Sequence, residues 1–246
     1  MKTIQLLAAF FILAITATTQ AQTAEEIVTN YIENTGGEEA WNNLKTLKIV
    51  ASVNQNGVDI PVVIMNTKDG KQKITANFQG QEIVQLAFDG ETAWATNFQA
   101  GKAEKLDSEA TENFKKINAK IFPTPFLNYK ERGHKIELLG EEIIDGTNTY
   151  KIKITMDPVI VEGQEVDNVE TYYFETENFV PIQSEVEQQQ GPQKGQIATD
   201  TYSDYEEVDG LYFAFARTVF GGQPIEIKTI EVNPEISDDQ FAFPKQ

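Results

Sequence analysis

The 246-residue chain contains no cysteine and only one histidine, His134. The missing thiols exclude disulfide scaffolds, thiol nucleophiles, iron–sulfur clusters and thiolate zinc sites. A metal centre built from several histidines is excluded by the same count. The sequence also lacks a Gly-x-Ser-x-Gly turn, a P-loop, a dinucleotide-binding glycine motif and an EF-hand loop. These absences leave two classes: an enzyme that uses carboxylate, tyrosine or serine groups, or a protein that acts by binding.

Positive charge is scarce, because 20 Lys and Arg stand against 38 Asp and Glu and give a formal net charge of -18. Such a surface repels phosphate backbones and anionic lipid headgroups, so nucleic acid is not an expected partner. Paired acids such as Glu141-Glu142 could serve a glycosidase. They lack the aromatic and polar neighbours of a sugar subsite, and we interpret them as a solvated surface. We predict neither a cofactor nor a metal.

Long hydrophobic runs are also missing. The longest comprises the ten apolar residues 6–15, too few to cross a hydrocarbon core ~30 Å thick. It follows Lys2 and precedes small residues at Thr19 and Ala21, the pattern of a secretory signal peptide that is cleaved after Ala21. We therefore expect residues 1–21 to be a signal peptide and residues 22–246 to be one exported domain. The predicted location is the periplasm, with secretion as the alternative, and no cysteine is available for a lipid anchor.

Two segments have the period of an amphipathic helix. The first begins at Thr23, which with Glu26 forms a predicted capping box, and it ends at Gly36-Gly37. The second covers residues 107–120, with a narrow apolar stripe, and it leads into residues 121–127, which two prolines stiffen.

From Leu44 onward the hydrophobic period changes to two, the period of half-buried strands. Asn-Gly, Asp-Gly and Gly-Gly pairs separate the runs and supply the positive φ of tight hairpin turns. Ten or eleven strands joined by short turns predict one large antiparallel sheet, which its own twist must curl. The fold class is therefore α+β, mainly β: a single curved antiparallel sheet whose concave face is covered by the helices.

The order of several motifs resembles that of a known family. The motifs are Tyr31-Ile32-x3-Gly36-Gly37, Phe88-Asp89-Gly90-x2-Ala93-Trp94, Leu127-Asn128-Tyr129-Lys130-x3-His134, Ile143-Ile144-Asp145-Gly146 and Tyr202-Ser203-Asp204-Tyr205-x2-Val208-Asp209-Gly210. This order is similar to that of the outer membrane lipoprotein-sorting proteins of Bacteroidetes, within the LolA/LolB-like lipoprotein localisation superfamily. The resemblance extends over essentially all of residues 22–246.

The resemblance implies an unclosed β-barrel of about eleven antiparallel strands with helices across its hollow as a lid. It also implies carriage of lipoprotein acyl chains, the role of better-known members. The membrane-anchored acceptor of that system has a lipidated cysteine and an exposed leucine loop, and this chain has neither, so the acceptor role does not transfer. LolA-type carriers hold the lid shut with a strand arginine, and the motif order does not decide whether Arg132 or Arg217 corresponds to it.

A carrier must replace the burial that an acyl chain loses in water, on the order of 12 kcal/mol for about fifteen methylenes. A movable lid meets this requirement, because its residues cover the bound chain and fill the cavity when the cargo is absent. The predicted lid or ligand-binding residues are Ile27, Val28, Tyr31, Phe114, Ile117, Phe122, Phe126 and Leu127. The predicted cavity-lining residues are Ile49, Val53, Ile74, Phe78, Trp94, Ile152, Ile154, Phe213 and Phe215. The same residues would form an ordinary core if the interior were filled, and the sequence leaves that choice open.

The predicted function is a non-catalytic periplasmic carrier or chaperone that binds a lipid or lipoprotein acyl chain, with donor and acceptor proteins in the envelope as further partners. One alternative is a cell-envelope interaction or sensor domain with a closed cavity. Another is a carboxylate-dependent hydrolase, which requires two acids with perturbed protonation in one cleft. His134 has no serine, cysteine or second histidine pattern around it, and we interpret it as a structural or surface residue.

Overall fold

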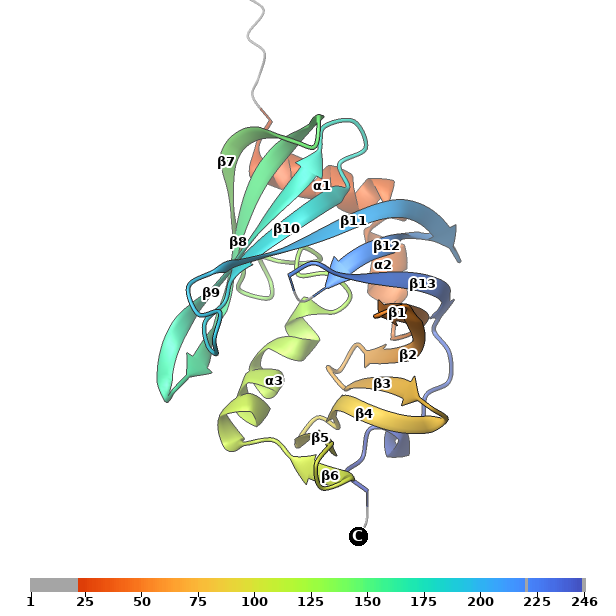
Figure 1. The fold of residues 1–246 in the computed structure, drawn as a ribbon. Helices are drawn as coiled ribbons and strands as arrows, with labels where there is room; N and C mark the ends of the chain where they lie inside the picture. Colours follow the sequence, from red (N-terminus) through yellow and green to blue (C-terminus); the bar gives the residue numbers. More distant parts are fainter. Residues whose placement is uncertain (1–21, 220, 245–246) are drawn as a thin grey trace, which may run out of the picture.

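The computed structural model describes residues 22–219 and 221–244 (Figure 1). The predicted signal peptide, residues 1–21, lies outside the described residues. The helices of the described chain are α1 (Ala24–Asn34), α2 (Glu38–Asn43), α3 (Ser108–Ile121) and the short 3-10 helix η1 (Asp238–Gln240).

Thirteen strands form a single open antiparallel sheet in the order β6-β5-β4-β3-β2-β1-β13-β12-β11-β10-β9-β8-β7. Their bounds are β1 (Thr46–Gln55), β2 (Val58–Thr67), β3 (Gln72–Phe78), β4 (Gln81–Phe88), β5 (Ala93–Asn97), β6 (Lys102–Lys105), β7 (Lys135–Ile144), β8 (Thr147–Val161), β9 (Gln164–Glu175), β10 (Pro181–Glu187), β11 (Ile197–Val208), β12 (Leu211–Val219) and β13 (Gln223–Val232). The predicted fold class is confirmed. The count exceeds the expected eleven, because strands as short as β5 and β6 are too brief to show an alternating pattern.

The sheet turns a corner at β11. The first half of this strand, Ile197 to Thr201, pairs with β10, whereas the second half, from Tyr202 onward, pairs with β12. Within the second half Asp204 takes a positive φ of 53°, while the register with β12 continues unchanged on both sides of it. Because β11 changes its partner along its length, the sheet turns here and curls around a concave face (Figure 1).

The capping box at the start of α1 is present. The Thr23 side chain accepts from the Glu26 backbone N–H at 3.2 Å, and Glu26 Oε2 accepts from the Thr23 N–H at 2.8 Å. The helix ends at Asn34, and two residues later Gly36 takes a φ of +133° that suits only glycine, where a Cβ would lie 2.5 Å from the Gly210 carbonyl oxygen. The chain that follows α1 therefore packs closely against the turn between β11 and β12.

The densest part of the core lies where α1 and residues 122–127 pack on β8 and β9. We call α1 and residues 122–127 together the roof. Phe126 is its centre: its ring lies 6.1 Å from that of Tyr31, 4.9 Å from Tyr172 and 5.2 Å from Phe174, each in an edge-on arrangement. Such aromatic pairs add to the free energy of burial alone. These ring contacts fasten the roof to β9.

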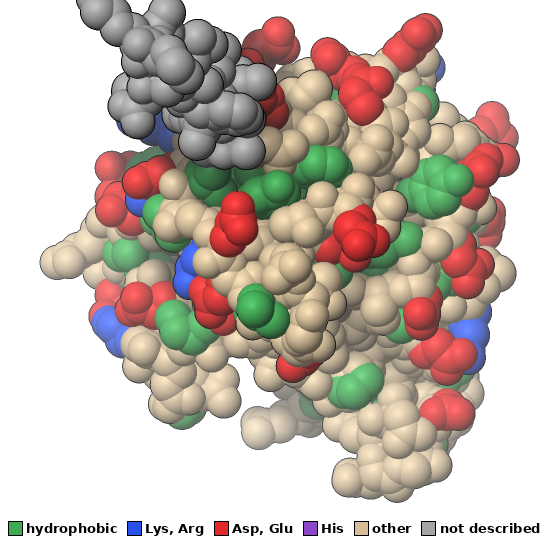
Figure 2. All heavy atoms as spheres, turned by 90° about the horizontal axis from the view of Figure 1, so that it is seen from above, with side chains coloured by type: hydrophobic (Ala, Val, Ile, Leu, Met, Phe, Trp, Pro, Cys, Tyr) green, Lys and Arg blue, Asp and Glu red, His purple; other side chains and the backbone are tan. Residues whose placement is uncertain are grey.

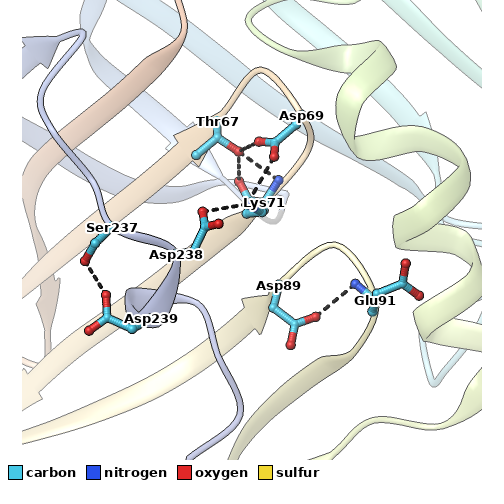
Figure 3. A network of polar contacts seen from close by, with 8 residues as sticks. All are labelled: Thr67, Asp69, Lys71, Asp89, Glu91, Ser237, Asp238 and Asp239. Atoms are coloured by element: carbon cyan, nitrogen blue, oxygen red, sulfur yellow. Dashed lines mark hydrogen bonds and ion pairs between the residues drawn. The ribbon is translucent and has the colours of Figure 1, made fainter.

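The C-terminal segment fastens the opposite end of the sheet. Phe241 is fully buried, and its carbonyl accepts from Trp94 Nε1 at 2.9 Å. Lys71 Nζ lies 2.6 Å from Asp238 Oδ1 and 3.2 Å from Asp69 Oδ2 (Figure 3). Burial alone would raise the pKa of Asp69, but its contacts with Thr67 and Lys71 lower it below the usual value. The β2–β3 turn and the η1 segment are thus joined by charged hydrogen bonds.

The surface in Figure 2 carries acidic side chains dispersed among few basic ones, with hydrophobic side chains mostly isolated from each other. None of the helices within residues 22–219 and 221–244 has the length and apolarity required to cross a membrane.

Candidate functional site

The concave face contains an open groove of about 520 Å³ over the middle of the sheet. Residues of β1, β2, β3, β4, β11, β12 and β13 line it, because every second side chain of a strand points to the same face. Its aliphatic surface consists of Ile49, Val53, Ile60, Val62, Ile64, Ile74, Val219, Ile225 and Ile227. The polar residues that line it are Gln55, Asn66, Gln72, Gln85, Asp200, Arg217 and Gln223. A mostly apolar cavity of this size with a few polar groups is typical of small-molecule sites, which span ~300–1,000 Å³.

A smaller hollow of about 250 Å³ lies between the roof and the sheet. Tyr31 and Phe126 of the roof face it, and four residues are shared with the groove, so the two spaces adjoin: Ile49, Asn66, Arg217 and Ile227. Aromatic side chains dominate this space, including Tyr172, Tyr202 and Phe213. Burial raises the pKa of Tyr31 to about 12, so its phenol stays neutral. The concave face therefore has an open aliphatic half and a roofed aromatic half.

The predicted lid residues separate into two groups. Six of them belong to the roof and are buried: Ile27, Val28, Tyr31, Phe122, Phe126 and Leu127. The other two, Phe114 and Ile117, lie on α3 and are only half-buried. Phe114 stacks on Phe88 of β4 with 5.6 Å between ring centroids, and neither Phe114 nor Ile117 lines the groove or the hollow.

Polar contacts, more than apolar burial, hold α3 in place. Asn118 is the only buried residue of this helix. The Asn113 amide pairs with the backbone of Ile160 on β8 in both directions, each at 2.7 Å. Asn118 Nδ2 donates to the Gly70 carbonyl at 3.2 Å, and a Cβ at Gly70 would lie 2.8 Å from the Ala119 nitrogen. The helix thus bridges the two arms of the curled sheet (Figure 1), and its contacts are of a kind that water can replace.

The predicted cavity residues are distributed over several environments. Ile49, Val53 and Ile74 line the groove, and Phe213 lines the hollow. The others lie outside both spaces: Ile152 and Ile154 are fully buried core, Phe215 packs on that core, Trp94 is buried against the C-terminal segment, and Phe78 is 45% exposed. Phe78 ends β3 beside the Gln79-Gly80 turn, where the strand extends past the cavity.

Sequence reasoning missed several lining residues. Residues 60–65 are apolar on both faces of the strand, so alternation gave no direction for Ile60, Val62 and Ile64. Arg217 had no motif to single it out. Ile225 and Ile227 alternate with polar residues in the sequence, as half-buried strand residues do. Their position beside β1 depends on the pairing of β1 with β13, which local sequence does not specify.

Arg132 connects the C-terminal end of α3 with the roof. Its Nη1 donates to the carbonyls of Lys120 and Thr124 at 2.8 and 2.9 Å, and its Nη2 donates to the Phe122 carbonyl at 2.8 Å. The last carbonyls of a helix have no partner within the helix, and the planar guanidinium satisfies several acceptors at once. Arg132 thus holds the backbone between α3 and the roof from a turn, and not from a strand.

His134 is a structural residue, as the sequence predicts. It is 4% exposed, and its Nδ1 donates to the Pro125 carbonyl at 3.0 Å. Burial lowers the pKa of His134, although the hydrogen bond to Pro125 opposes the shift. The imidazole is therefore held neutral between the turn and the roof.

This burial predicts a pH-dependent stability. The unfolded chain takes up a proton near the usual histidine pKa of about 6.5, whereas the folded state resists it. The free energy of unfolding should fall as the pH drops from about 6.5 toward 5, by at most about 1.4 kcal/mol per pH unit. Denaturant unfolding of the wild type and of His134→Asn, which keeps a donor near Nδ1, measures this. The two curves should converge at low pH. Parallel curves would contradict the assignment, and NMR of the single imidazole gives its pKa directly.

No group of three or more His, Asp or Glu side chains that could hold a metal ion occurs within the described ranges, 22–219 and 221–244. Among the carboxyl groups, burial raises the pKa of Glu170, and the nearby Asp200 adds to this effect. Only Asp200 of these two lines the groove.

No family model matches the chain, and no curated protein matches it. Solved structures do resemble it. A DUF1329 family protein from Desulfovibrio piger has a TM-score of 0.53 at 12% identity, over 89% of this chain and 97% of that one. A LolA superfamily protein from Nitrosomonas europaea has a TM-score of 0.51 at 13% identity, over 90% and 98% of the two chains. An outer membrane lipoprotein-sorting protein domain from Vibrio parahaemolyticus has a TM-score of 0.51 at 10% identity, over 89% and 95%.

At these identities the likeness shows the fold. The chain has the LolA-like fold that its motif order suggests, and the narrower Bacteroidetes-type subfamily stays a prediction.

Proposed function

We propose that this protein is a non-catalytic carrier that binds the acyl chain of a lipid or lipoprotein in the groove. In this proposal residues 1–21 direct export and are removed after Ala21, and the domain of residues 22–246 works in the periplasm. Donor and acceptor proteins of the envelope deliver and receive the cargo. The fold shared with LolA superfamily proteins supports this direction.

One observation carries the proposal: the open groove of about 520 Å³ on the concave face, with nine aliphatic side chains along it. Each methylene that moves from water into such a surface contributes about 0.8 kcal/mol. A chain of ten or more carbons therefore gains enough to offset the cost of ordering it. The open groove favours the carrier over a sensor domain with a closed cavity, because an exposed apolar hollow is costly unless a ligand uses it.

The positions of the carboxyl groups do not support the hydrolase alternative. It requires two carboxyl groups facing one cleft at glycosidase spacing. Glu170, the carboxyl with the raised pKa, lines neither the groove nor the hollow. Asp200 lines the groove, but its Oδ1 already accepts from the Gly221 N–H at 2.9 Å.

Binding of a neutral single-chain ligand tests the proposal. Nile red fluorescence with the mature protein should show saturable binding that dodecanol displaces. Val53→Gln places an amide on the groove floor, where a bound chain would bury it without a partner at about 1–3 kcal/mol. We expect the affinity for dodecanol to fall roughly five- to hundredfold.

Ser52→Gln is the matched control, since neighbouring strand positions point to opposite faces and Ser52 is absent from the groove. Its affinity should equal that of the wild type. The proposal fails if the wild type shows no saturable binding, or if Val53→Gln and Ser52→Gln bind alike.

A further inference from the structure

Arg217 occupies the junction between the open groove and the roofed hollow. It lies on β12 and pairs in register with Tyr202 on β11, at the corner where β11 passes from one neighbour to the other. Its side chain lines both spaces. Among the described residues that line them, it is the only Lys or Arg.

The guanidinium has no anionic or hydrogen-bonding partner within the described chain. Its Nε is buried without a hydrogen bond, and none of the ion pairs among the described residues includes it. The guanidinium lies over a ring face instead, with its carbon 5.5 Å from the Tyr202 centroid. Buried polar groups are nearly always paired in folded proteins, and a charged group left unpaired is especially costly. An acceptor from outside the chain would remove this cost.

Two carboxyl groups, those of Asp200 and Glu170, lie near Arg217, and neither serves as the hydrogen-bond acceptor of its guanidinium. Asp200 lines the groove, but it is committed to the Gly221 N–H. Burial raises the pKa of Glu170, although the positive charge of Arg217 opposes this shift, so the neutral form of Glu170 is favoured and it is a weak counterion. The positive charge of Arg217 is therefore left for a ligand, and the aliphatic groove extends from it.

We propose that the ligand is a long-chain carboxylate, whose head binds the Arg217 guanidinium and whose alkyl chain lies along the groove. This inference rests on the proposed function and specifies the chemical class of the cargo. A carboxylate matches the guanidinium because two parallel N–H···O bonds can form between the planar groups. The ring of Tyr202 holds the guanidinium from one side, so its orientation is set before the ligand arrives.

Three ligands of equal chain length, dodecanoate, dodecanol and dodecyltrimethylammonium, test the proposal by displacement of Nile red. Arg217→Gln should weaken dodecanoate binding at least about tenfold, the loss expected for hydrogen bonds to a charged group, and change dodecanol binding less than about threefold. Asp200→Asn keeps the acceptor for Gly221 and removes a like charge, so it should strengthen dodecanoate binding alone. Arg217→Lys keeps the charge but loses the paired N–H donors of the guanidinium, so it should bind dodecanoate more tightly than Arg217→Gln and more weakly than the wild type.

Lys135→Gln is the control for net charge, because Lys135 is exposed on β7 away from the groove. Its dodecanoate affinity should match that of the wild type. If Arg217→Gln weakens dodecanoate and dodecanol equally, or if the ammonium ligand binds as tightly as the carboxylate, this inference is wrong while the carrier proposal stands. If none of the three ligands binds the wild type, the carrier proposal fails too. Arg217→Lys serves as the decisive variant if Arg217→Gln does not fold.

Discussion

Replacing Phe126 by alanine is expected to lower the free energy of unfolding by about 3–5 kcal/mol, the loss typical of a deleted aromatic in a packed core. Phe126 is 2% exposed, and its ring contacts those of Tyr31, Tyr172 and Phe174. The substitution removes all three contacts and leaves a cavity beneath the roof. In a domain of this size each kcal/mol changes Tm by ~2–4 °C, so Tm should fall by roughly 6–20 °C.

Denaturant unfolding followed by near-ultraviolet circular dichroism measures this change, because the signal reports the aromatic cluster. Phe98→Ala is the matched control: Phe98 is 71% exposed, and its loss should change the unfolding free energy by less than about 0.5 kcal/mol. A loss below about 1 kcal/mol for Phe126→Ala would mean that the roof is detached from the sheet in solution. The groove lies outside the cluster, so dodecanol binding by the folded fraction should persist.

Arg132→Ala is the second substitution with a large expected effect. The guanidinium donates to three carbonyls of the α3–roof connection, and its removal leaves these acceptors without partners in a partly buried site. We expect a loss of about 2–4 kcal/mol. The loss should be accompanied by faster amide hydrogen exchange in α3 and residues 122–127, because these segments depend on the same bonds.

Arg132→Lys tests whether charge alone suffices. A lysine ammonium is a point donor that cannot reach all three carbonyls in the planar arrangement of Arg132, so this variant should recover less than half of the lost stability. Lys130→Ala is the control within the same turn, since Lys130 bridges to an exposed Glu25 and such pairs contribute little. Equal stability of Arg132→Ala and Lys130→Ala would show that the carbonyls find water instead.

Much of the architecture follows from local sequence. The Thr23–Glu26 box and the Gly36-Gly37 pair bound α1 as expected, because capping and positive φ are decided by single residues. The alternating runs and the hairpin dipeptides also predict the antiparallel sheet, because strand alternation and tight turns depend on residues close together in the chain. The helix predicted over residues 107–120 was found as Ser108–Ile121.

The interior was less predictable, because it depends on which strands become neighbours. Ile152 and Val53 have the same alternating pattern, yet Ile152 is fully buried under the roof and Val53 faces the open groove. Their difference arises from the distance of each strand from the roof, which no local pattern encodes. Phe114 likewise lies on the predicted apolar stripe of α3. Its ring packs on Phe88 at the end of β4, and it does not line the groove.

The sheet order has a consequence for how the protein can be made. All neighbouring strands are consecutive in the chain except β1 and β13, which join Leu47 to Val232. Each hairpin can close as it is synthesised, whereas this one junction waits for nearly the whole described chain and closes the longest loop. Ile49 and Val53 lie on one side of the junction, and Ile225 and Ile227 lie on the other. A nascent chain therefore has no complete groove, and we expect it to bind no apolar ligand before β13 is in place.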